Sequence, residues 1–191
     1  MLDCKSVNTL MECGIKLSKM DLKEMDSTLF KSLVVSLRYV TCTRSNISFA
    51  VGLISRFMKN LANSHMKAAK RILYYLKGTL DYGLFYSSSK DFKLMSYYDC
   101  DFVGDLDDRK STTDFIFFLG DHAISWSSKK QSIVILSTCE SEYITAISYV
   151  CHAIWLRRLL KELYSPHKKT TKILIDNKSA QALAKNSVYH D

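Results

Sequence analysis

Residues 97–109, YYDCDFVGDLDDR, place five aspartates within thirteen positions. Such a stretch is compatible with a calcium-binding loop, a solvated acidic turn or the strand end of a metal site, and its flanks distinguish these possibilities. A calcium loop of the helix-loop-helix type requires an acidic or amide side chain at its fifth position and glutamate at its twelfth. Counted from Asp99, these positions hold Val103 and Lys110. The calcium loop is therefore excluded.

The segments around this stretch have the alternating pattern of β-strands. In residues 92–100, 111–120 and 122–128, successive side chains alternate between two faces, and aromatic residues are frequent. A tight Gly120-Asp121 connection joins the last two segments. We expect three strands in an antiparallel meander.

A long helix and a second α/β pair are predicted after the meander. Residues 137–164 contain no glycine or proline and begin with Ser137 and Glu140, which predict a capping box. Residues 172–176 predict a short buried strand, and residues 177–186 a helix directly behind it. The order β-β-β-α-β-α indicates an α/β fold with a sheet of mixed direction.

The first half of the chain has the period of amphipathic helices. We expect helices over 28–42 (apolar stripe Leu29, Leu33, Leu37 and Val40), over 46–62 (capped by Asn46) and over 64–78 (capped by Ser64 and ending at Gly78). Residues 1–90 hold 14 Lys/Arg against 6 Asp/Glu, whereas residues 91–191 hold 13 of each. The basic excess suits a phosphate-backbone partner, or simply a solvated helical surface.

Composition indicates an ordinary globular protein. The 191 residues are 47% hydrophobic and 24% charged, with a net charge of +8. The six cysteines include no C-x-x-C pair, so we expect reduced thiols rather than a disulfide framework or a zinc site. No signal peptide or membrane span is predicted. We expect an intracellular protein, cytoplasmic or nuclear, with no membrane partner.

Three acidic residues stand where a solvated turn does not account for them. Asp99 ends an apolar strand, Glu142 lies one turn into the long helix, and Asp176 ends the short buried strand. Carboxylates from two strand ends and one helix suit Mg²⁺, which takes oxygen ligands. Asp176 could instead cap the helix that follows it. Asp105, Asp107 and Asp108 fit a solvated acidic turn between two strands.

Four blocks of the sequence carry a family resemblance. They are YYDCDFVGDLDDRKSTTDFIFFLG, ISWSSKKQSIVILSTCESEY, HAIWLRRLLKEL and IDNKSAQALAKN. In this order they closely resemble the ribonuclease H region of Ty1/copia-type retrotransposon polyproteins. Upstream, residues 29–58 and 65–86 are similar to the segment that links the reverse transcriptase to that region. The resemblance covers almost the whole chain.

The resemblance implies a ribonuclease H-like domain over 92–191, preceded by a mainly helical connection segment over 1–91. It implies metal-dependent hydrolysis of the RNA strand of an RNA–DNA hybrid, with two Mg²⁺ ions, or Mn²⁺ in their place. Asp99, Glu142 and Asp176 match the metal-binding, catalytic carboxylates of the family. The remainder of the reverse transcriptase polyprotein would be a further partner.

Four basic residues are candidates for contacts with the phosphates of the hybrid, or else solvated loop charges. They are Arg109, Lys110, Lys129 and Lys130.

The sequence also departs from the family pattern. Tyr98 and Phe102 replace the usual small residue and tryptophan around the two aspartates, and Asp114 stands where the family usually has glycine. The chain stops at NSVYHD, where the family continues into another strand and helix with a fourth metal-binding position, and Asp191 is not assigned that role. We therefore expect a sheet that lacks its last strand and helix.

Three functions stay open on the sequence. The chain is an active ribonuclease H-type nuclease, a catalytically inactive retroelement relic that keeps the fold and at most binds nucleic acid, or a helical nucleic-acid-binding protein whose acids are structural.

Overall fold

The computed structural model describes residues 4–19, 27–88, 93–163 and 172–174, together with Ala182 and Lys185. The chain separates into two compact units, Met1–Leu84 and Phe85–Asp191, each with its own buried core. The domain boundary expected after residue 91 concerns independent folding, which compactness does not test. It stays a prediction.

Helices build the first unit, as predicted. They are α1 (Ser27–Val40), α2 (Ser48–Ser55), preceded by the 3₁₀ turn η1 (Ser45–Ile47), and α3 (Asn63–Gly78). The prediction of one helix over 46–62 is wrong after Ser55. The N–H groups of Arg56 and Phe57 bond to carbonyls three residues back, at 3.2 and 3.1 Å, so the helix tightens and ends. The turn buries Phe57 and stacks its ring on His65 with centroids 3.9 Å apart.

Two helix starts differ from the predicted caps. Asn46 does not cap a helix, because its Nδ2 donates to the hydroxyl of Tyr75 at 2.7 Å. The third helix begins before Ser64, and the N–H of Ala62 donates to Nδ1 of His65 at 3.0 Å. In both places a tertiary or buried contact replaces the short-range serine or asparagine cap that the sequence favours.

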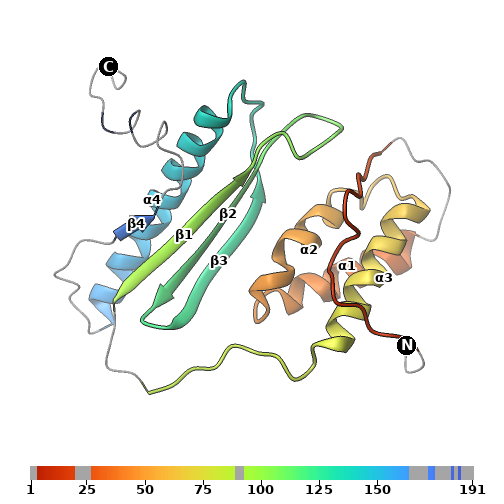
Figure 1. The fold of residues 1–191 in the computed structure, drawn as a ribbon, viewed down its shortest axis with the longest axis horizontal. Coiled ribbons are helices and arrows are strands. Elements are labelled where there is room, and N and C mark those ends of the chain that lie inside the picture. Colours follow the sequence, from red (N-terminus) through yellow and green to blue (C-terminus); the bar gives the residue numbers. More distant parts are fainter. Residues whose placement is uncertain are drawn as a thin grey trace. The chain divides into compact units, whose positions relative to one another are not determined.

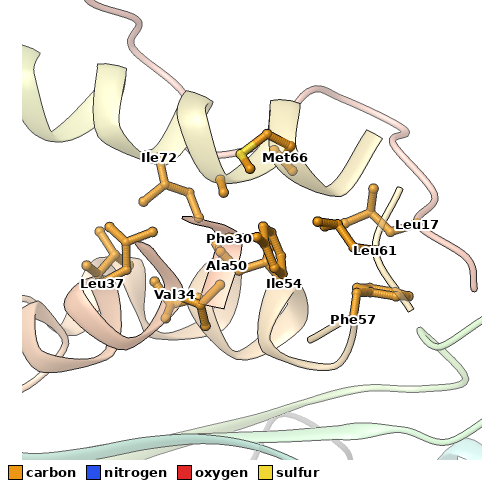
Figure 2. Packing of buried hydrophobic residues seen from close by; sticks show 14 residues of the cluster. Leu17, Phe30, Val34, Leu37, Ala50, Ile54, Phe57, Leu61, Met66 and Ile72 are labelled. Atoms are coloured by element: carbon orange, nitrogen blue, oxygen red, sulfur yellow. The ribbon is translucent and has the colours of Figure 1, made fainter. Parts of the chain in front are cut away.

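The core of the first unit is formed by side chains from all three helices. Figure 2 shows Phe30, Val34 and Leu37 of α1 facing Ala50 and Ile54 of α2 and Met66 and Ile72 of α3. Their spacing of three and four residues puts them on one face of each helix. The predicted apolar stripe is wrong at Leu29, whose side chain is 59% exposed, because the neighbouring Phe30 occupies the core position.

A four-stranded sheet forms the second unit. Its strands are β1 (Leu94–Asp101), β2 (Thr112–Leu119), β3 (His122–Lys130) and β4 (Lys172–Leu174), in the order β3-β2-β1-β4. The pairs β1–β2 and β2–β3 are antiparallel, and β1–β4 is parallel. The predicted meander and the mixed direction are confirmed. Gly120, between β2 and β3, has a φ of 60°, which glycine adopts without strain.

The helix α4 (Thr138–Glu162) runs along one face of this sheet (Figure 1). Only the Ser137 half of its predicted capping box is confirmed, since Ser137 Oγ accepts the N–H of Glu140 at 3.1 Å. The Glu140 carboxylate reaches back to the N–H of Leu136, at 3.3 Å, rather than to that of Ser137. Buried residues then pack helix to sheet, namely Leu94, Phe117, Tyr149, Ala153 and Leu156.

The architecture is therefore α/β. The predicted strand over 172–176 is described as far as Leu174. Asp176 lies outside the described residues, and of the predicted helix over 177–186 only Ala182 and Lys185 are described, both helical. None of the described helices combines the length and the hydropathy that a membrane span requires.

Candidate active site

Asp99 lies near the C-terminal end of β1 and is exposed. Its neighbours Ser96, Tyr98 and Cys100 face α4, since Ser96 bonds to the hydroxyl of Tyr149, the Tyr98 ring packs on that of Tyr149, and Cys100 contacts the helix start. Because side chains alternate along a strand, Asp99 projects from the opposite face. Its Oδ1 accepts the N–H of Cys100 at 2.8 Å. The Asp99 carboxylate is therefore solvated rather than buried in the sheet.

Asp114 is the register partner of Asp99 on β2. Partners in an antiparallel pair project from the same face, so both carboxylates leave the sheet on the side away from α4. Like charges directly opposite each other destabilise a sheet. A cation bound beside this pair would therefore reduce the repulsion between the two carboxylates.

Glu142 lies near the start of α4 and is half-buried, with its Oε2 atom shielded from water. The preceding residue, Ser141, is buried, and its Oγ lies 2.7 Å from the Sγ of Cys100. This contact holds the start of the helix against the strand end that carries Asp99. Glu140 is exposed, and its carboxylate accepts the N–H of Leu136 at the start of the helix.

The structure brings Asp99 and Glu142 to the same end of the second unit, but Asp99 projects from the sheet face away from α4, the helix that carries Glu142. Within the described ranges, no group of three or more His, Cys, Asp or Glu side chains lies close enough to hold a metal ion. The third predicted ligand, Asp176, belongs to the part of the chain outside those ranges. The donor chemistry of the predicted set, carboxylate oxygens alone, suits Mg²⁺ and Mn²⁺.

The loop between β1 and β2 is organised by a buried ion pair. Asp105 is only 5% exposed, and its Oδ2 lies 2.6 Å from the ammonium of Lys130. Its Oδ1 accepts the N–H groups of Asp107 and Asp108 at 3.0 and 3.3 Å. The same ammonium lies 2.7 Å from the carboxylate of Asp108. The expectation of a solvated acidic turn is wrong for Asp105, because Lys130 and the loop backbone compensate its burial.

These contacts lower the pKa of Asp105. Burial alone would raise it, but the hydrogen bond from Lys130, the two backbone N–H groups and the Lys130 charge outweigh burial and hold the pKa well below its ordinary value. The carboxylate therefore stabilises the folded loop at neutral pH.

We expect Asp105→Asn to lower the free energy of unfolding by about 2 kcal/mol near neutral pH, because it removes one charge of a largely buried pair. The folded-state pKa lies below the unfolded value of about 4, so the stabilisation is present above that value and is lost as the pH falls toward the folded pKa. Urea unfolding, followed by the fluorescence of Trp126 and Trp155, measures the free energy of unfolding of both proteins. The difference between mutant and wild type should be smaller in strong acid than at neutral pH. A difference in the free energy of unfolding that does not change with pH would contradict the stabilising role of the Asp105 carboxylate.

The four predicted phosphate contacts lie at this same end of the sheet, in different surroundings. Arg109 and Lys129 are exposed, and Lys110 is half-buried. Lys130, whose side chain is 22% exposed, would have to give up its two ion pairs to bind a phosphate. Arg109 and Lys129 are the stronger candidates.

Sequence reasoning placed Asp105 in a solvated turn and missed Gln131 altogether. Both are buried. The positive charge that pairs with Asp105 lies 25 residues further along the chain, and a single glutamine after two lysines has no periodic signal. Contacts distant in sequence decide both.

Comparison with known proteins places the chain among transposon polyproteins. Over its whole length it is 42% identical to the retrovirus-related Pol polyprotein from transposon TNT 1-94 of Nicotiana tabacum and 40% identical to that from transposon RE1 of Arabidopsis thaliana. It spans 15% and 13% of the length of these two relatives. Over 69% of the chain it is also 37% identical to secreted RxLR effector protein 161 of Plasmopara viticola, covering 94% of that protein.

No family model matches the chain, and no solved structure matches it. The full-length likeness to Pol polyproteins, at 40% identity and above, agrees with the four sequence blocks that resemble that group. The chain belongs to the retrovirus-related Pol polyproteins of Ty1/copia-type transposons.

Proposed function

We propose that the chain supplies the ribonuclease H activity of a retrotransposon Pol polyprotein, hydrolysing the RNA strand of an RNA–DNA hybrid. The sheet order β3-β2-β1-β4, with α4 between β3 and β4 along the chain, is compatible with a ribonuclease H-like fold. Its relatives are Pol polyproteins of transposons. A retroelement requires removal of RNA from hybrids after reverse transcription, so the activity suits such a polyprotein.

The register of β1 and β4 is the observation that carries this proposal. Tyr97 and Leu174 are partners in this parallel pair. Asp99 stands two residues after Tyr97, and Asp176 stands two residues after Leu174. The C-terminal ends of parallel neighbouring strands meet at one edge of a sheet, which is where two metal-binding carboxylates would be needed.

Asp99, Glu142 and Asp176 would hold the metal in this proposal. When bound, a pair of Mg²⁺ ions would activate the attacking water and stabilise the leaving 3′ oxygen. Asp99 projects from the sheet face away from α4, so its carboxylate and that of Glu142 would have to turn toward each other to share a metal. The Asp99 carboxylate is oriented by the N–H of Cys100, and Glu142 is carried on a helix start held against β1 by the Cys100–Ser141 contact.

The basic side chains at this end of the sheet would bind the hybrid through its phosphates. Arg109 and Lys129 are exposed and free of the ion pairs that occupy Lys130. Phosphate contacts of this kind weaken as salt rises, because they release counterions. The specificity for a hybrid would come from the 2′-hydroxyls of one strand and their absence from the other.

The test is cleavage of a duplex whose RNA strand is labelled, by the 191-residue chain with Mg²⁺ or Mn²⁺. We expect the RNA of an RNA–DNA hybrid to be cut, and neither an RNA duplex nor a DNA duplex of the same sequence to be cut. Chelation should abolish cleavage. No cutting by a sample shown to be folded would support the alternative that the chain is a catalytically inactive relic.

A further inference from the structure

The three helices of the first unit lie in a stretch of the chain that contains no acidic residue. Residues 27–80 hold nine lysines and arginines and neither an aspartate nor a glutamate. Of the six acidic residues in the unit Met1–Leu84, five precede this stretch and Asp81 directly follows it. Positive charge without compensation destabilises a compact structure through self-repulsion. A folded helical unit that keeps such charge therefore has the composition of a surface for an anionic partner.

The helix α3 carries a row of lysines on the face that points away from the core. Met66 and Ile72 of this helix are buried in the core of the unit (Figure 2). Lys67, Lys70 and Lys77 recur at the helical spacing of three and seven residues, so their side chains lie on one face, opposite to Met66 and Ile72. At the rise of an α-helix, the three lysines extend over about 15 Å.

Lys67 and Lys70 are the cations of this face that the fold does not use. The neighbouring Arg71 forms an ion pair with Glu12 at 3.3 Å, and Lys77 donates to a backbone carbonyl of the N-terminal segment, that of Cys4, at 2.6 Å. Lys67 and Lys70 are exposed, and neither forms an ion pair or a hydrogen bond with another described side chain. A phosphate can therefore reach both ammonium groups without displacing a contact of the folded unit.

We propose that the face of α3 that bears Lys67 and Lys70 binds the phosphate backbone of a nucleic acid duplex without reading its sequence. A DNA duplex carries one negative charge per roughly 1.7 Å of its axis, so several phosphates lie within reach of two lysines one helical turn apart. Contacts from lysine to phosphate fix the position of a protein on a duplex but carry no sequence information. This inference goes beyond the proposed function, because it requires neither a metal nor cleavage and concerns the other unit of the chain.

An anionic membrane surface is the competing partner, and the packing of α3 disfavours it. Helices that bind at a membrane surface have an apolar face beside their lysines, and this face enters the lipid. The apolar side chains of α3 are instead part of the core of the unit, where Met66, Ala69 and Ile72 are buried and Leu73 and Leu76 pack against the buried cluster. The face that carries the lysines therefore offers charge without the apolar area that lipid binding requires.

The test measures the binding of a short labelled DNA duplex and of an RNA–DNA hybrid by fluorescence anisotropy, with EDTA present and over a series of salt concentrations. The full chain is compared with the double variant Lys67→Ala/Lys70→Ala. Alanine favours helix, so α3 should stay folded, which circular dichroism verifies. The matched control is Arg158→Ala/Lys161→Ala, which also removes two exposed cations three residues apart on a helix. That helix, α4, carries acidic residues as well.

We expect the wild type to bind both duplexes, with an affinity that falls as the salt concentration rises. Each phosphate contact contributes roughly 0.9 to the slope of the logarithm of the binding constant against the logarithm of the salt concentration, so Lys67→Ala/Lys70→Ala should make this slope shallower by about 1.8. Between about 50 and 200 mM salt, the double variant should therefore lose roughly tenfold less affinity than the wild type. The control should keep the wild-type slope, and so should Lys67→Arg/Lys70→Arg, because both charges remain.

The outcomes separate this inference from the proposed function. If Lys67→Ala/Lys70→Ala and the α4 control give the same slope, binding follows the net charge alone and the site on α3 is overturned. A folded wild type that binds neither duplex overturns it too, and so does tighter binding to phosphatidylserine vesicles than to either duplex. Duplex binding with the expected slopes but without cleavage in Mg²⁺ would contradict the proposed function and support the site on α3.

Discussion

Replacing Asp99 with asparagine will abolish the proposed hybrid cleavage while leaving folding nearly unchanged. We expect a loss of about a thousandfold or more, because a bound metal supplies several kcal/mol of transition-state stabilisation and each 1.4 kcal/mol is a factor of roughly ten. Asp99 is exposed, and an asparagine oxygen can still accept the N–H of Cys100. The substitution also removes one of the two like charges of the Asp99–Asp114 pair.

Asp101→Asn is the matched control for this experiment. Asp101 is exposed and lies on the same strand and the same face, two residues further along. The control should keep most of the cleavage activity, because the loss depends on the position of Asp99 rather than on the charge of the strand end. Initial rates on labelled hybrid with Mg²⁺ measure both variants, and thermal melting verifies that both are folded. Cleavage retained in Asp99→Asn would overturn the site assignment.

The largest effect on stability is expected at Phe117. Its side chain is fully buried, stacks on Tyr149 with ring centroids 5.0 Å apart, and meets Phe115 edge-on. Phe117→Ala should lower the free energy of unfolding of the second unit by about 3–5 kcal/mol, since it removes a large apolar side chain and leaves a cavity between sheet and helix.

Phe118→Ala provides the comparison, because Phe118 is the next residue of the same strand and faces the other side of the sheet. It is half-buried and contacts Tyr97 edge-on. Phe118→Ala should lower the free energy of unfolding by less, about 1–2 kcal/mol. Both tryptophans of the chain, Trp126 and Trp155, belong to the second unit, so denaturant unfolding followed by their fluorescence reports on it. Equal losses for the two variants would mean that α4 does not pack against the Phe117 face.

Much of the local structure follows from short-range patterns. Strand alternation placed the three strands of the meander within one or two residues, and the serine before the long helix caps it as expected. These features depend on residues a few positions apart, so a single sequence contains them. The family assignment has the same basis, because four ordered blocks suffice to identify it.

The errors fall where buried or tertiary contacts outweigh the local capping and periodicity signals. Asn46 and Ser64 have side chains that favour helix caps. The Asn46 side chain instead donates to a tyrosine of another helix, and the buried His65 makes the hydrogen bond at the start of the helix near Ser64. Phe57 ends its helix early because its ring packs against His65. Periodicity cannot anticipate such contacts, since burial against another element outweighs local propensity.

Short-range patterns in the chain were enough to predict the order of helices and strands, the family, and the carboxylates that are candidates for the site. The folded arrangement was needed to show that Asp99 faces away from α4, that Asp114 stands directly opposite it, and that the Cys100–Ser141 contact holds the start of α4 near this strand end. The same arrangement shows that Lys130 stabilises a loop and that Gln131 joins strands and helix. Register and burial couple residues far apart in the chain, and no local pattern records that coupling.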